Sequence, residues 1–135
     1  MFKRSMTRPR GGRIGNVYAA PRDLVIAFSD SWLPMDQEKV TKYFAFTRGS
    51  AHVGIYDYKR TNLYAKGLPH PKTFWSGNEV AQFSLGGHID PLLIPVFQEW
   101  LREQGVDLAV VRLDSEEERV PQEPDGLGQS AVASI

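Results

Sequence analysis

Residues 39–75 concentrate side chains that bind anions and flat rings. A cation or an aromatic ring stands at nearly every second position there: Lys39, Lys42, Arg48, Lys59, Arg60, Lys66 and Lys72, with Tyr43, Phe44, Phe46, Tyr56, Tyr58, Tyr64, Phe74 and Trp75. Cations neutralise phosphates and aromatic rings stack on bases. The composition of this stretch therefore favours a polyanion or an acidic, flat partner surface.

Within this stretch, residues 51–58 alternate, which predicts a strand with an apolar face and an aromatic face. His52, Tyr56 and Tyr58 share the aromatic face. On an open sheet they would form a platform for bases, each stack contributing about 1 to 3 kcal/mol. The candidate residues for binding nucleic acid or a partner are Arg4, Arg8, Arg10, Arg13, Arg48, His52, Tyr56, Tyr58, Lys59, Arg60 and Lys66.

The N-terminal residues 1–16 supply further cations. They hold five basic residues, three glycines and one proline, with little apolar material. Such a segment cannot bury enough surface to fold alone, so we expect a basic flexible arm. At Arg10 an Arg-Gly-Gly unit combines a guanidinium that bridges phosphates with glycines that allow close approach of the backbone.

Catalytic residues are sparse. The histidines are His52, His70 and His88, and no HExxH spacing, GxSxG motif or cysteine accompanies them. His52 with Asp57 or Asp30 is the one acid–base pair that the sequence suggests, and it leaves a small hydrolase as an alternative. We predict a protein that is not an enzyme, with no cofactor and no metal site.

The composition is that of one globular domain of 135 residues, 41% of them hydrophobic. The absence of cysteine excludes disulfides and fits a reducing compartment. No apolar run approaches the roughly 18 residues that span a bilayer, and the N-terminus lacks the apolar part of a secretory signal. We therefore expect no membrane association and a soluble protein, in the cytoplasm or in a particle assembled there.

The net charge of zero conceals two halves of opposite sign. Residues 1–75 hold 13 Lys and Arg against five acids, and residues 76–135 hold three Arg against 11 acids. Opposite halves suit a basic surface for nucleic acid, and they also suit head-to-tail packing of identical subunits. The alternative is that the two halves neutralise each other within one fold.

The expected elements alternate between strand and helix. An apolar run predicts a buried strand at residues 23–28, and apolar side chains at helical spacing predict a helix from about 35 to 48. The strand at 51–58 is followed by a turn at 59–62, a short strand at 63–66, a loop at 67–77, a strand at 79–85, a helix at 90–105 and a strand at 106–113.

This order favours an α+β domain at residues 17–113 with the ferredoxin-like arrangement β-α-β-β-α-β, an antiparallel sheet with both helices on one face. Residues 114–135 read as an acidic tail.

Two functions fit these features. We rank first a non-catalytic structural subunit of a larger complex, such as a virus particle or a ribonucleoprotein, that docks through the basic arm and the acidic tail. Such a subunit would form a homo-oligomer or join neighbouring subunits. The second is a module that binds single-stranded nucleic acid with the aromatic and basic sheet face.

Overall fold

The computed structural model describes residues 1–28, 32–33 and 39–115, which form an α+β fold. The elements are β1 (Lys3–Ser5), β2 (Arg13–Ala19), α1 (Pro21–Phe28), β3 (Trp32–Leu33), β4 (Tyr43–Arg48), β5 (Ala51–Tyr56), α2 (Pro71–Trp75), β6 (Ala81–His88), the 3-10 turn η1 (Pro91–Leu93), α3 (Ile94–Glu103) and β7 (Val110–Leu113). In this part of the chain no helix is long and apolar enough to cross a bilayer.

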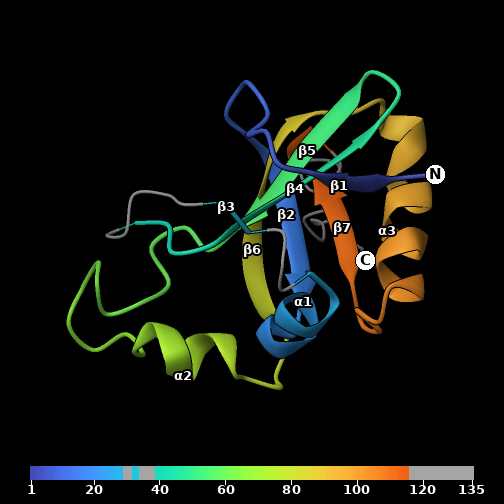
Figure 1. Cartoon of the computed structure of the whole chain (residues 1–135). Helices are drawn as coiled ribbons and strands as arrows, with labels where there is room; N and C mark the ends of the chain where they lie inside the picture. Colours follow the sequence, from blue (N-terminus) through green and yellow to red (C-terminus); the bar gives the residue numbers. More distant parts are fainter. Residues whose placement is uncertain (29–31, 34–38, 116–135) are drawn as a thin grey trace, which may run out of the picture.

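The strands form one seven-stranded sheet in the order β1-β4-β5-β6-β2-β7, with β3 also paired to β4. All neighbours are antiparallel. Strand β2 lies between β6 and β7, and α3 runs beside β7 (Figure 1). Two strands precede the first helix, so both the element order and the strand order differ from the expected ferredoxin-like arrangement.

The main core lies between one sheet face and the three α-helices. Aromatic rings fill its centre: Phe28 stacks on Trp100 with ring centroids 5.8 Å apart, and Phe2 meets Phe97 at 4.8 Å. The strong amphipathicity of residues 94–103 explains why the helix expected near this position is confirmed, with Asp90 capping the turn that precedes it.

Helix α1 occupies the segment expected to be a strand at residues 23–28. Pro21 begins the helix, where its missing N–H costs no hydrogen bond. Leu24 and Phe28, one helical turn apart, are buried, whereas Ile26 is 67% exposed. The run is continuous because the exposed position 26 and the partly buried positions 25 and 27 are apolar as well, and the strand prediction is wrong.

At β4 the mismatch is the opposite one, a strand where a helix was expected. The helix expected from 35 to 48 is a strand from Tyr43 onward, and residues 34–38 lie outside the described part. The four residues from Tyr43 to Phe46 are all buried. Both faces of β4 are therefore covered, which removes the alternation that identifies a strand in sequence.

The remaining elements agree in part with expectation. The strands expected at 51–58, 79–85 and 106–113 are present as β5, β6 and β7. Residues 63–66 form turns instead of a strand, and the loop expected at 67–77 contains α2.

The N-terminal residues differ from the expected arm. Lys3–Ser5 pairs with β4, and Phe2 is 2% exposed within the main core. One aromatic side chain with a place among Phe97 and Trp100 is enough to attach a segment otherwise poor in apolar residues. Of the acidic tail expected at 114–135, only Asp114 and Ser115 are described.

Candidate nucleic-acid interface

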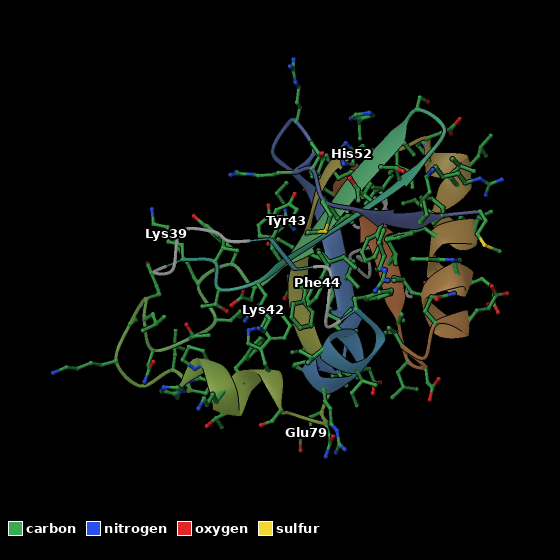
Figure 2. The ribbon with its side chains drawn as sticks, in the orientation of Figure 1. Lys39, Lys42, Tyr43, Phe44, His52 and Glu79 are labelled. Carbon is green, nitrogen blue, oxygen red and sulfur yellow. The ribbon has the colours of Figure 1, made fainter. Side chains whose placement is uncertain are left out.

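A second, smaller cluster lies on the sheet face opposite the main core. Tyr43 and Ala45 of β4 and the preceding Val40 are buried there, and Tyr56 of β5 packs against them. The rings of Tyr43 and Tyr56 stack with centroids 4.9 Å apart and an interplanar angle of 6°. Figure 2 labels Tyr43 at the position where β4 approaches the N-terminal loop. The sheet thus carries a fixed pair of tyrosines outside its core.

Glycines on the neighbouring strands make room for these rings. A Cβ atom at Gly54 of β5 would lie 2.1 Å from the Tyr43 ring, and one at Gly86 of β6 would lie 3.2 Å from the Tyr56 ring. Real Cβ atoms do not approach ring atoms as closely as the first distance, so Gly54 is required for Tyr43 to lie flat on the sheet.

The loop between β1 and β2, residues 6–12, lies against this face. The Nε2 atom of His52 donates to the Thr7 carbonyl at 2.8 Å, and the Gly87 N–H donates to the Gly12 carbonyl at 3.2 Å. The Arg8 guanidinium is thereby placed 5.8 Å from the centroid of the Tyr43 ring. His52, expected as part of a stacking platform, instead holds the loop that carries Arg8.

The loop at residues 6–12 and the tyrosines of this face line a cavity of about 350 Å³, which we name the tyrosine cavity. It is lined by Arg8, Gly11, Gly12, Arg13, Val40, Tyr43, Tyr56, Tyr58 and Ser84. Four predicted site residues, Arg8, Arg13, Tyr56 and Tyr58, therefore come together from two distant segments. Tyr43 and Ser84 were missed, Tyr43 because its segment was assigned to a helix.

Burial keeps the phenols of Tyr43 and Tyr56 neutral. Burial raises the pKa of Tyr43 to about 12, with a further increase from Tyr56, while Arg8 acts in the opposite direction. Burial also raises the pKa of Tyr56, and Arg13 and Arg8 oppose this. At neutral pH Tyr43 and Tyr56 are therefore hydrogen-bond donors, and the cations among the lining residues are the two guanidinium groups.

Lys59 extends the cationic surface beyond the cavity. Its ammonium lies 5.0 Å from the ring centroids of both Tyr58 and Tyr64, and hydrogen bonds to the Tyr64 and Tyr58 hydroxyls raise the pKa of Lys59. Lys59 has a positive φ of 59°, and its N–H donates to the Lys39 carbonyl at 2.6 Å. The local backbone thus directs this lysine toward the two exposed rings.

The other predicted cations do not line the tyrosine cavity. The Arg48 guanidinium lies 5.9 Å from the Phe2 ring centroid, and Arg4 lines a hollow on the helix side of the sheet with Phe28 and Trp100. These residues belong to the main-core side of the molecule. Arg10, Arg60 and Lys66 are not among the residues that line the cavity.

The suggested His52–Asp57 pair does not form. Asp57 is fully buried and accepts hydrogen bonds from the N–H groups of Thr41 at 2.8 Å and Lys42 at 2.9 Å, and from the Thr41 hydroxyl. Burial raises the pKa of Asp57, and these hydrogen bonds oppose the increase. The carboxylate therefore fixes the segment before β4.

His52 lies within β5, whereas Asp57 follows the end of that strand, and their side chains have different partners: the Thr7 carbonyl for His52 and Thr41 for Asp57. Asp30 is outside the described residues. Among residues 1–28, 32–33 and 39–115, no three His, Cys, Asp or Glu side chains gather in a way that could hold a metal ion.

No protein-family model matches the chain, and no curated protein shows significant sequence similarity to it. The residues of the site and their chemistry are therefore what supports a functional proposal.

Proposed function

We propose that this protein binds single-stranded nucleic acid at the tyrosine cavity. The observation that carries the proposal is the convergence of Arg8 and Arg13, from the N-terminal segment, with Tyr56 and Tyr58, from the end of β5, around one cavity. Proteins that bind single-stranded nucleic acid combine cationic side chains and aromatic rings in their binding grooves. Both types line this one cavity.

Each group has a distinct role in this proposal. Arg8 and Arg13 neutralise phosphates of the nucleic acid, and the glycines at 11 and 12 let the nucleic acid approach the protein backbone of the loop. Tyr58, which is 43% exposed, offers a ring on which a base stacks. Tyr43 is almost fully buried, so it supports Tyr56 from below and does not itself meet a base.

Fluorescence anisotropy with a labelled oligothymidine tests the proposal. Tyr58→Ala is expected to weaken binding by about 1 to 3 kcal/mol, whereas Tyr58→Phe, which keeps the ring, is expected to bind like the natural chain. Because two phosphate contacts are expected, raising salt from about 50 to about 200 mM should weaken binding about sevenfold. A natural chain that binds no oligonucleotide at the lower salt would refute the proposal.

Arginine substitutions provide a matched control. Arg8→Gln removes a cavity cation, and Arg48→Gln removes a cation near Phe2 on the other side of the sheet. We expect Arg8→Gln to weaken binding and to reduce the salt dependence, because one fewer counterion is released. Equal losses for the two variants would mean that the cavity is not the binding site.

A second candidate function is the structural subunit, docked onto a further copy of the chain. A groove of about 410 Å³ supports it, lined by Met1, Phe2, Pro95, Val96, Glu99, Trp100 and Glu103. Apolar walls with two glutamates at the rim suit an apolar partner segment that carries cations, and the N-terminal half of another copy is rich in cations.

Light scattering coupled to size-exclusion chromatography, at low and high salt, separates the two candidates. Charge-driven assembly predicts an oligomer free of nucleic acid that dissociates as salt is raised. Val96→Glu should dissociate it at low salt, whereas Glu79→Lys, outside the groove, should not. A monomer under all conditions would exclude self-assembly and leave the nucleic-acid proposal untouched.

A further inference from the structure

A separate and larger cavity, of about 460 Å³, lies between α1, α2 and the segment that precedes β4. It is lined by Val25, Thr41, Lys42, Leu63, Pro71, Lys72, Trp75 and Ser76. None of these residues lines the tyrosine cavity. Its size is within the range of about 300 to 1,000 Å³ that is usual for small-molecule sites. We name it the α1–α2 cavity.

The indole of Trp75 forms a fixed wall of this cavity. Its Nε1 atom donates to the Thr41 hydroxyl at 2.8 Å, and that hydroxyl in turn donates to the buried Asp57 carboxylate. The indole also stacks on Phe83, with ring centroids 5.4 Å apart, and meets Phe44 edge to face at 5.9 Å. A ring held at its polar edge and by its neighbours is a preorganised surface for a ligand.

The described lining of the cavity is mostly apolar, and its two charged residues are both lysines. Val25, Leu63 and Pro71 complete the apolar lining, and the charged residues of the lining are Lys42 and Lys72. The Lys42 ammonium lies 6.0 Å from the centroid of the Trp75 ring, and Figure 2 places Lys42 between the sheet and α2. Among residues 1–28, 32–33 and 39–115, no acidic side chain lines the cavity. An apolar body with a negative head therefore complements the site.

We propose that the α1–α2 cavity binds a small organic carboxylate with an apolar body, such as an aryl acid. A monoanion is favoured over a phosphate ester because a dianion loses more hydration free energy when it enters a mostly apolar site. The ammonium groups hold the carboxylate, while the apolar body lies against Trp75 and Leu63. This site acts without nucleic acid, so its existence does not depend on the function proposed above.

The test compares 2-naphthoate with 2-naphthamide, which has the same body and no charge. Calorimetry of the full chain is expected to show saturable binding of one naphthoate and weaker binding of the amide. In nuclear magnetic resonance spectra the Trp75 indole N–H signal, assigned with Trp75→Phe, should shift with the same affinity. The proposal would be overturned by naphthoate binding that does not saturate, by equal affinity of the two compounds, or by tighter binding of 2-naphthyl phosphate.

Variants identify the cavity as the site. Lys42→Met and Lys72→Met should each weaken naphthoate by about fivefold, the scale of one solvent-exposed charge pair, and leave the amide unchanged. Lys66→Met is the control, because Lys66 is exposed in the turns between β5 and α2 and does not line the cavity. Leu63→Trp, at a half-exposed position, should fill the cavity and abolish binding. Equal effects of the three lysine variants would contradict the assignment.

Discussion

At the scale of single residues, Tyr43 connects the sheet to the tyrosine cavity. Its ring lies over Gly54, stacks on Tyr56 and receives the Arg8 guanidinium. Because the ring is buried against the sheet, its hydroxyl is held in the neutral form well above the usual pKa of tyrosine. The burial that shapes the cavity therefore also makes the free energy of unfolding of the protein depend on pH.

The pH dependence has a defined sign. A raised pKa of about 12 means that the folded chain holds the Tyr43 proton more tightly than the unfolded chain, whose value is near 10.0. The stabilisation is complete below pH 10 and is lost as pH rises through 12, by at most about 3 kcal/mol. The free energy of unfolding, measured with urea between pH 10 and 12, should fall more steeply for the natural chain than for Tyr43→Phe. Parallel curves would show that Tyr43 titrates normally.

The ion pair between Arg13 and Asp114 is a second residue-scale feature of the cavity. The Arg13 Nη1 atom lies 2.8 Å from Asp114 Oδ2, and both side chains are 40% exposed. Arg13 lines the tyrosine cavity, so a phosphate that binds there competes with the carboxylate for the same guanidinium.

A double-mutant cycle measures this competition. Asp114→Asn should tighten oligothymidine binding by up to about fivefold, the range of an exposed ion pair. In the Arg13→Gln background, Asp114→Asn should have little effect because the shared cation is absent. An equal gain in both backgrounds would indicate a general charge effect, and no gain in either would show that the pair does not restrain binding.

At the scale of elements, α3 covers an edge of the sheet. Its Gln98 accepts a hydrogen bond from the Val111 N–H at 3.0 Å, and the Arg102 Nε atom donates to the Ala109 carbonyl at 3.0 Å. These backbone groups belong to β7 and the residue before it, at the end of the strand order. An edge with its polar groups occupied does not accept a further strand.

Uncovering this edge should cause association. In the variant Gln98→Leu with Arg102→Leu, the β7 edge keeps unpaired backbone groups, and we expect oligomers that grow with protein concentration. Light scattering at several concentrations checks this, with Asp107→Leu as the control at an exposed position between α3 and β7, outside the groove of the second candidate function. A monomeric double variant would mean that another feature protects the edge.

The two misassigned elements show what sequence reasoning lacked. Residues 23–28 and 43–46 are both continuous apolar runs, yet the first is α1 and the second is β4. In β4 both faces are covered, and in α1 the exposed position 26 is apolar too, so neither period appears in the sequence. The strands with one solvated face, and α3 with its amphipathic pattern, were predictable.

The candidate site was predictable in its residue types and not in its geometry. Arg8 and Arg13 were identified as cations of an arm, and Tyr56 and Tyr58 as rings of a strand. Their meeting depends on the loop at 6–12 being attached through His52 and Gly12, which no local pattern encodes. Long-range pairing of this kind follows from the fold alone.

At the scale of the whole molecule, the two charge halves partly interleave. Strand β2 from the basic half lies between β6 and β7 from the acidic half, and the Arg13–Asp114 pair joins them. Strands β1, β4 and β5, all from the basic half, are neighbours at the opposite end of the strand order from β7 (Figure 1).

Phe2 gives the whole-molecule packing a direct test. It connects the first residues to Phe97 and Trp100 of α3, so Phe2→Ala should reduce the free energy of unfolding by about 3 to 5 kcal/mol. Met6→Ala, at a side chain that is 63% exposed, should change it by less than about 0.5 kcal/mol. Urea unfolding followed by tryptophan fluorescence distinguishes them. A small loss for Phe2→Ala would mean that the N-terminal residues form an arm after all.

The central place of β2 also bears on how the chain acquires its structure during synthesis. Strand β2 ends at Ala19, and its two partners begin only at Ala81 and Val110. A chain emerging from the ribosome therefore has neither partner for β2 until β6 has been translated, and one edge of β2 stays open until β7 follows. Long loop closures of this kind slow folding, so interrupted translation would leave fragments prone to aggregate.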